Sequence, residues 1–175
     1  LCFEGERTNS YRIIRAIKNR FGSTNEIGVF EMGDSGLIEI PNPSEVVMAE
    51  RPKNTSGSCA GCVMQGTRPI ITEIQSLVSK TVYANGKRAS DGFDYNRMSI
   101  ILAVMEKRCG FFFGSLDVYV NVIGGLRLTE PATDLAVAIA LYSGLCDKPV
   151  GDKVLAFGEI GLSGEVRSVP RILER

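Results

Sequence analysis

The stretch GGLRLTEPATDLAVAIALYSGL, residues 124–145, decides the fold of this chain. Two glycines supply a turn, Pro131 suits the first turn of a helix, and the apolar run after it is dense enough for a buried helix. Such a turn is shaped to present a side chain at a helix start. The residue at that place is Ala132, which presents only a methyl group.

Strands and helices alternate on both sides of this stretch, which predicts an α/β domain with mixed strand pairing. A helix is expected over residues 94–110, capped by Asp94, ended by Gly110, with an apolar face of Ile100, Ile101, Val104 and Met105. The other expected elements are a hairpin over 63–80 that turns at Gly66 and Thr67, a strand over 116–124, a helix over 132–145 and a strand-turn-strand over 154–169.

The first 40 residues read as strands separated by turn residues: LCFE, YRIIRAIKNR, EIGVFEM and GLIEI. A helix over residues 10–21 is an open alternative, because Ile13, Ile14 and Ile17 also fit a period of 3.6. A short helix is expected near residues 41–50, with Ser44 as its N-cap. The predicted division is residues 1–50, a polar linker at 51–58, and an α/β domain at 59–175. Both ends fall inside expected elements, so we expect a fragment truncated at its C-terminus.

Composition and charge exclude several classes of protein. The chain has 175 residues, 44% of them hydrophobic and 23% charged, as folded soluble domains have. No window predicts a transmembrane helix and the N-terminus lacks signal-peptide features, so we expect a cytoplasmic protein without membrane contact. Twenty basic residues balance twenty acidic ones, and there is no histidine, which excludes Ser-His-Asp and Cys-His catalysis.

The five cysteines include one pair with a recognisable spacing, Cys59 and Cys62 in SCAGC. A C-x-x-C pair can be half of a zinc site or a redox motif. No second pair or histidine completes it, so we expect buried reduced thiols and no metal site.

At its second half the sequence resembles a known family. The strand LDVYVNV, the loop to Pro131 and its helix, and then Gly158, Glu159, Ile160, Leu162 and Gly164 resemble the proteolytic domain of Lon-type proteases. In that family the residue after the proline is the nucleophilic serine, and a later lysine is its base. The matching positions here are Ala132 and Arg175.

Neither matching residue can do the family's chemistry. A methyl group cannot attack a carbonyl, and arginine, with a pKa above about 12, cannot become the neutral base that a desolvated lysine becomes. Glu130 and Asp134 flank the helix start; a catalytic carboxylate pair is conceivable, but charges there commonly stabilise the helix dipole. The scaffold is therefore expected to lack protease activity.

The first half extends the resemblance to the whole chain. KNRFGSTNEIGVFEM, residues 18–32, resembles the KNRFG motif of the RadA/Sms family of bacterial DNA-repair proteins. The resemblance implies that residues 1–50 end a RecA-like ATPase core and that a Lon-like domain follows. It also implies a zinc finger, ATP and Mg²⁺ for the full-length protein. This chain has no G-x-x-x-x-G-K-[ST] motif, so no cofactor site is expected within it.

The KNRFG residues Lys18, Asn19, Arg20, Phe21 and Gly22 are candidates for a role in ATP hydrolysis. In hexameric motors that resemble this family, such hairpins reach a neighbour's nucleotide, where one cation can stabilise γ-phosphate charge in trans. The alternative is a solvated basic hairpin without a partner.

DNA, single-stranded or branched, is the second partner that the resemblance implies, together with the recombinase RecA and a homo-hexameric ring. The candidate DNA-binding residues are Lys87, Arg88, Arg97, Arg68 and Arg127. Lys87 and Arg88 lie in the glycine-bearing segment NGKRASDG, where two adjacent cations could meet phosphates.

Three functions remain in competition. The first is part of a DNA-dependent ATPase that processes recombination intermediates and drives their branch migration, with a Lon-like scaffold that binds DNA. The second is a peptidase that uses Ser143, Ser163 or Ser168, none of which has a lysine at the expected distance. The third is an interaction module that docks a recombinase without touching DNA.

Overall fold

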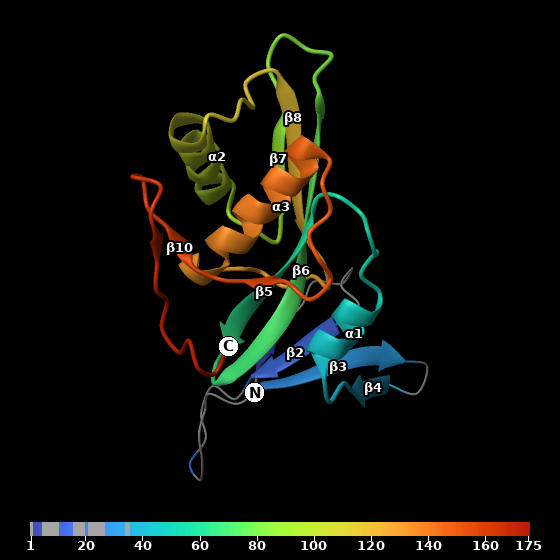
Figure 1. Cartoon of the computed structure of the whole chain (residues 1–175). Coiled ribbons are helices and arrows are strands. Elements are labelled where there is room, and N and C mark those ends of the chain that lie inside the picture. The colour runs from blue at the N-terminus through green and yellow to red at the C-terminus, as the bar shows by residue number, and fades with distance from the viewer. Residues whose placement is uncertain (1, 5–10, 16–19, 21–26, 34–35) are drawn as a thin grey trace.

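The computed structural model describes residues 2–4, 11–15, 20, 27–33 and 36–175 (Figure 1). Four antiparallel strands come first, in the order β1-β2-β3-β4: β1 (Cys2–Glu4), β2 (Tyr11–Arg15), β3 (Ile27–Gly33) and β4 (Gly36–Glu39). The strand interpretation is confirmed over these ranges, and the alternative helix is wrong over residues 11–15.

Helix α1 (Pro43–Ala49) follows, and its N-cap corrects an expectation. The cap is Asn42, whose side-chain oxygen accepts the Glu45 N–H at 3.3 Å. Pro43 takes the first helical position, so the residue before it becomes the cap. Ser44 has another use, because its Oγ accepts the backbone N–H of Ile71 at 2.9 Å.

The main sheet has five strands in the order β7-β8-β6-β5-β9. Its strands are β5 (Ser58–Gln65), β6 (Arg68–Lys80), β7 (Arg88–Asp91), β8 (Leu116–Val122) and β9 (Leu155–Ala156). β5, β6 and β8 pair antiparallel, whereas β7 and β9 pair parallel to β8 and β5, so the pairing is mixed as predicted. The hairpin with its turn at Gly66 and Thr67 is confirmed.

The C-terminal strand-turn-strand is only partly as expected. Residues 154–169 divide into β9, which joins the main sheet, and a separate antiparallel pair of β10 (Glu159–Ile160) and β11 (Val166–Arg167). Gly158, with φ 157°, separates β9 from β10. Each of these three strands has only two residues, which is too short for an alternation of apolar and polar residues to show where one strand ends and the next begins.

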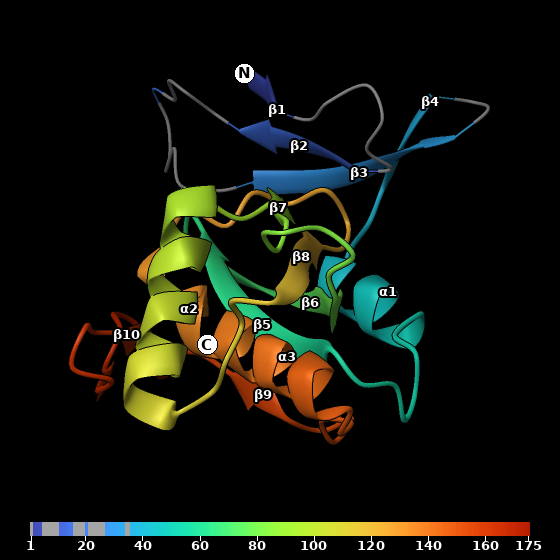
Figure 2. The ribbon, with the colours of Figure 1, turned by 90° about the horizontal axis from the view of Figure 1, so that it is seen from above.

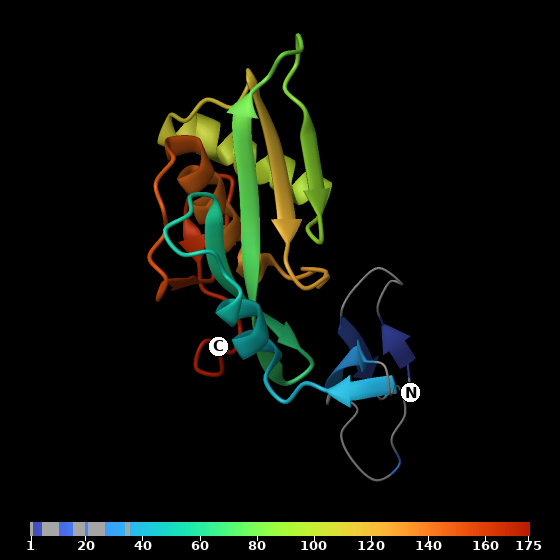
Figure 3. The same cartoon turned by 90° about the vertical axis from the view of Figure 1, so that its right-hand side faces the viewer.

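Helices α2 (Tyr95–Cys109) and α3 (Asp134–Cys146) cover one face of the main sheet, and in Figure 3 both lie behind it. Asp94 caps α2 by accepting the Arg97 N–H at 2.7 Å, and Gly110 ends it in the left-handed region at φ 73°. The buried face is Met98, Ile101, Leu102, Val104 and Met105. Ile100, expected on that face, is 38% exposed and does not belong to the buried face.

The hydrophobic core lies between this sheet and the two helices (Figure 2). α3 is buried through most of its length, including Ala136, Val137, Ala140 and Leu141, which explains its nearly unbroken apolar sequence. None of the helices in the described part of the chain is long and apolar enough to cross a membrane.

The segment at residues 51–58, expected to be a linker, makes buried contacts. Arg51 is 7% exposed; its Nε donates to Ser58 Oγ at 2.9 Å and its Nη2 to the Ser58 carbonyl at 3.1 Å. Ser58 Oγ donates in turn to the buried carboxylate of Glu73 at 2.6 Å. Residues 51 and 58 thus join α1 to β5 and β6 through a charged network, and the division of the chain into domains stays a prediction.

Candidate functional site

Ala132 lies where the sequence places it, in a short 3-10 turn, Pro131–Thr133, that leads into α3. It is 2% exposed, and its carbonyl accepts the Gly158 N–H at 2.7 Å. Thr133 Oγ1 donates to the Glu130 carbonyl at 3.1 Å and fixes the turn. Hydrogen bonds on both sides hold the turn in place, but the position carries a methyl group without a nucleophilic atom.

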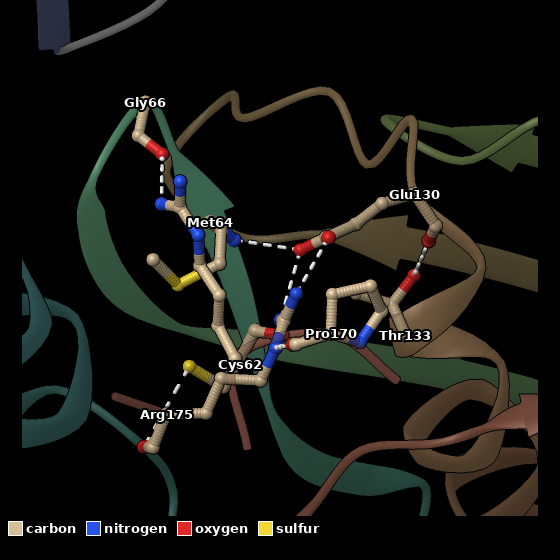
Figure 4. A network of polar contacts seen from close by, with 8 residues as sticks. Cys62, Met64, Gly66, Glu130, Thr133, Pro170 and Arg175 are labelled. Atoms are coloured by element: carbon tan, nitrogen blue, oxygen red, sulfur yellow. Dashed lines mark hydrogen bonds and ion pairs between the residues drawn. The ribbon is translucent and has the colours of Figure 1, made fainter. Parts of the chain in front are cut away.

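Arg175, the residue at the other expected catalytic position, reaches the same turn. Its guanidinium binds Glu130 through two hydrogen bonds, Nη1 to Oε1 at 2.9 Å and Nη2 to Oε2 at 2.6 Å (Figure 4). Nη1 also donates to the Cys62 carbonyl at 2.7 Å. The Met64 N–H donates to Glu130 Oε1 at 2.6 Å. The side chain of Arg175 is 1% exposed, so the ion pair is shielded from water on that side.

This environment fixes the charge of Arg175. The hydrogen bonds to Glu130 raise the pKa of Arg175 above its ordinary value, against the opposing effect of burial. A permanently protonated guanidinium cannot accept a proton from a hydroxyl. At the position where the sequence predicts the base of a Lon-type dyad, Arg175 is therefore a structural cation.

The second carboxylate near the helix start, Asp134, also has an arginine partner. Asp134 is fully buried; Arg97 donates to it through Nε at 3.0 Å and through Nη2. The backbone N–H of Ile160 donates to Asp134 Oδ2 at 3.0 Å, and Arg97 Nη2 donates to the Ile160 carbonyl at 2.9 Å. The hydrogen bonds that Arg97 donates to Asp134 raise the pKa of Arg97. Asp134 thus joins α2, α3 and β10, while it also lies at the helix start that favours an acidic residue.

A cleft of about 390 Å³ lies in front of these two ion pairs. Its lining residues are Phe93, Asp94, Arg97, Leu128, Thr129, Glu130, Pro131 and Asp134. The Leu128 N–H donates to the Gly92 carbonyl at 2.8 Å, which holds the two walls together. Three carboxylates line the cleft: Glu130 and Asp134 are each paired with an arginine, and Asp94 caps α2.

The alternative nucleophiles are not arranged for catalysis. Ser143 is buried in α3, where its Oγ donates to the Lys148 carbonyl at 2.5 Å and accepts the Gly57 N–H at 2.8 Å. Ser163 lies exposed in the turn before β11, and Ser168 is exposed directly after it. Their positions give the peptidase hypothesis no support.

Cys59 and Cys62 do not fit a zinc or redox site. They lie three residues apart on β5, so their side chains point to opposite faces of the sheet. Burial raises the pKa of Cys59 to about 11 and that of Cys62 above its usual value, the latter opposed by the charge of Arg175. Within the described ranges, no three Cys, Asp or Glu side chains gather closely enough to hold a metal ion.

The candidate DNA-binding residues do not form one cluster. Arg97 forms an ion pair with Asp134. Arg68, at the start of β6, donates through Nη2 to the Pro41 carbonyl. Arg88 folds back on the chain and donates to the carbonyls of Phe113, at 2.7 Å, and Leu116. Lys87 is exposed, with its Nζ 3.9 Å from the centre of the Tyr83 ring.

Arg127 is exposed on the rim of a second cleft of about 350 Å³, where Asp91 and Asp94 are also found. Of the KNRFG residues, Arg20 is described and exposed. Lys18, Asn19, Phe21 and Gly22 lie outside the described residues. The predicted roles of all these residues stay predictions.

Comparison with known proteins identifies the relatives of this chain. All 175 residues align with a protein named "DNA repair protein RadA" from Listeria monocytogenes, at 53% identity. Proteins of the same name from Streptococcus pyogenes serotype M3 and Streptococcus pneumoniae are 52% and 51% identical over the same length. The chain is therefore a relative of RadA. It spans 38% to 42% of the length of these proteins.

A second comparison concerns the α/β part alone. Residues 95–175 match the family described as subunit ChlI of Mg-chelatase. The matched range begins with α2 and contains the turn at Ala132, both ion pairs and Arg175. The resemblance to RadA is thus confirmed over the full chain, with a Lon- and ChlI-like domain in its second half.

Sequence reasoning missed the partners of both arginines. The sequence suggests Glu130 and Asp134 as one group, either a catalytic pair or charges at the helix dipole, whereas in the structure each binds a different arginine. The backbone groups of Cys62 and Met64 that bind Arg175 and Glu130 carry no sequence signal. One sequence signal could have indicated a partner for Arg175. An arginine expected at a buried position requires an anion nearby, and Glu130 is that anion.

Proposed function

We propose that this chain is part of a DNA-dependent ATPase of the RadA type, which acts in recombinational DNA repair in the bacterial cytoplasm. Its α/β part serves as a scaffold for a homo-oligomeric ring and as a surface for DNA, without protease activity. The observation that supports this most is the pair formed by Arg175 and Glu130, because it occupies a formed catalytic turn with groups that cannot cleave a peptide.

The scaffold role follows from what the turn retains. The rigid entry to α3, the Asp134 network and the packed sheet are all present, and only the reactive groups are replaced. Each of the two ion pairs has one buried member, whose desolvation is costly, and this supports a structural role for the pairs in holding the shape of the domain. Ring assembly, ATP and Mg²⁺ binding and an upstream zinc finger belong to the full-length protein on this proposal.

The test uses the full-length protein with labelled single-stranded and branched DNA at two salt concentrations, together with its mass in solution. A ring that binds DNA, with affinity falling steeply as salt rises, supports the proposal. Binding of purified recombinase by a protein that does not bind DNA at either salt concentration would favour the docking module instead.

For the KNRFG motif we propose a role in trans at a neighbour's nucleotide. Exposure of Arg20 is compatible with it. In the full-length protein, Lys18→Ala or Arg20→Ala should reduce DNA-stimulated ATP turnover by a factor on the order of a thousand, while nucleotide binding stays near normal. Arg12→Ala, in the neighbouring strand β2, is the control for a general loss of charge. Unchanged turnover in both motif variants would remove this role.

A further inference from the structure

Two loops meet at the end of the main sheet that lies away from β1–β4, at the top of Figure 1. One comprises residues 80–88, between β6 and β7, and the other residues 107–116, between the end of α2 and β8; we call them the apical loops. The Thr81 N–H donates to the Ser115 carbonyl at 3.2 Å, and Arg88 donates to the carbonyls of Phe113 and Leu116. The two loops therefore form one connected surface.

The apical loops are rich in cations. Residues 80–88 contain three lysine or arginine residues and residues 107–116 contain two, and neither range contains a carboxylate. The adjacent Asp117 is buried, and its Oδ1 accepts the Lys87 N–H at 2.7 Å. That hydrogen bond, the Thr81 hydroxyl and the charges of Lys87 and Arg88 hold the pKa of Asp117 below its usual value. Glu106, just before the second loop, accepts the Phe113 N–H at 2.8 Å.

The same loops expose aromatic rings. Tyr83 is 57% exposed and Phe112 is 67% exposed. The Phe112 ring lies against Gly114, where a Cβ atom would be 2.9 Å from it, so backbone supports one side of the ring. The Lys87 ammonium lies 3.9 Å from the centre of the Tyr83 ring, which places a cation directly beside an aromatic surface.

Exposed rings beside exposed cations suit one class of ligand particularly well. In single-stranded nucleic acid the bases can stack on aromatic side chains, while the phosphates lie close enough to meet lysine. In a duplex the bases are already stacked on one another and cannot reach the rings. A surface with cations alone would not make this distinction.

We propose that the apical loops form a single-strand binding platform, in which Tyr83 and Phe112 stack with unpaired bases of DNA while Lys80 and Lys87 contact the phosphates. This inference rests on the proposed function and gives its DNA surface a location and a preferred structure. Of the DNA-binding candidates predicted from sequence, it retains Lys87. Arg88 becomes a residue that positions the two loops, because its guanidinium is used on backbone carbonyls.

The test compares full-length wild type with Tyr83→Ala/Phe112→Ala, using fluorescence anisotropy of a labelled oligothymidine of about 30 nucleotides. A second probe is an abasic oligonucleotide of the same length, which keeps the phosphates and lacks the bases. The double variant should bind oligothymidine about ten-fold or more weakly and the abasic probe unchanged. Lys80→Glu/Lys87→Glu should weaken binding of both probes and reduce the salt dependence.

The matched control is Tyr95→Ala, because Tyr95 is 50% exposed but lies at the start of α2. Wild-type binding of oligothymidine by all variants would overturn the platform while leaving the proposed function intact. Absence of DNA binding in the wild type would instead contradict the proposed function. Loss of binding to vesicles with anionic lipid in the double variant, with DNA binding unchanged, would assign the rings to a membrane surface and overturn the proposal.

Photo-crosslinking gives an independent readout. An oligonucleotide that carries 5-iododeoxyuridine should crosslink to peptides containing Tyr83 or Phe112. Crosslinks confined to other peptides would contradict the platform even if affinity falls in the variants.

Discussion

The guanidinium of Arg175 and the carboxylate of Glu130 face each other with two hydrogen bonds, of 2.9 and 2.6 Å, beside the turn that holds Ala132. Forty-five residues separate them in the chain. This pairing, with the Cys62 carbonyl and the Met64 N–H, lies where the resemblance to Lon-type proteases predicts the catalytic dyad. Its consequences for activity and for stability can be tested separately.

Restoring the nucleophile alone should not restore proteolysis. Ala132→Ser places a hydroxyl at the helix start, but the pKa of Arg175 is raised by Glu130, so no base is available there. Ala132→Ser/Arg175→Lys should also remain inactive, because the Glu130 carboxylate favours the charged form of a lysine. Hydrolysis of a fluorogenic peptide by the full-length variants measures this. Turnover by Ala132→Ser alone would contradict the assignment of Arg175 as a structural cation.

Breaking the ion pair should destabilise the α/β part. Arg175→Met leaves Glu130 without its cation and should lower the free energy of unfolding by about 3 kcal/mol, since one member of a largely buried pair loses its partner. The double variant Glu130→Gln/Arg175→Met should lose less unfolding free energy than the sum of the losses in Glu130→Gln and Arg175→Met. Urea denaturation of the four proteins gives the coupling energy. Additive losses would show that the two side chains contribute independently.

Asp134 should matter as much for folding, because it is fully buried and joins three elements. Asp134→Asn keeps the shape but removes the charge that Arg97 requires, so we expect a loss of about 3 kcal/mol in unfolding free energy. Asp91→Asn, at an exposed position of β7, is the matched control. Equal stability of the two variants would show that the Arg97 contact contributes little.

The thiols should differ in reactivity according to their burial. Cys59 has a pKa of about 11, so at pH 8 about one molecule in a thousand carries its thiolate, whereas Cys109 is exposed. A thiol reagent should therefore label Cys109 rapidly and Cys59 only after unfolding. Mass spectrometry of labelled peptides at successive times distinguishes them. Rapid labelling of Cys59 in the folded protein would contradict its burial.

The same shift predicts a dependence of stability on pH. The pKa of Cys59 is raised in the folded state from 9.0 to about 11. The contribution of the neutral thiol to the free energy of unfolding is therefore fully present below pH 9 and is lost as the pH rises toward 11. The loss should amount to about 2 kcal/mol. Subtracting the profile of Cys59→Ala isolates this contribution from other titrating groups. Parallel profiles for the two proteins would contradict it.

Elements marked by local signals could be predicted from the sequence. The start and end of α2 follow from Asp94 and Gly110, and the β5–β6 hairpin follows from the turn at Gly66 and Thr67. Such signals act between residues a few positions apart. At α1 the local signal was present but was assigned to the wrong residue, because Pro43 moves the cap back to Asn42.

The candidate site could be predicted only in part for the opposite reason. The turn at Ala132 is local and was found, while the partners of Glu130 and Asp134 come from 45 and 37 residues away. Folding alone brings those arginines to the helix start. The exposure of Ile100 has a similar origin, because a period of 3.6 defines a helical stripe but not which of its edges the sheet covers.

The attachment of α1 has a mechanical consequence. Before the helix, the Pro41 carbonyl is bound by Arg68; within it, Ser44 is bound by Ile71; after it, Arg51 is held by Ser58. The partner in each of these hydrogen bonds belongs to β5 or β6, so the helix is attached to the main sheet before, within and after its own residues. Because of this attachment, a rotation of the strands before α1 would also rotate the long strand β6, since no loosely held segment of the described chain separates them. A rotation of β1–β4 would thus reach the far end of the main sheet, where the apical loops lie.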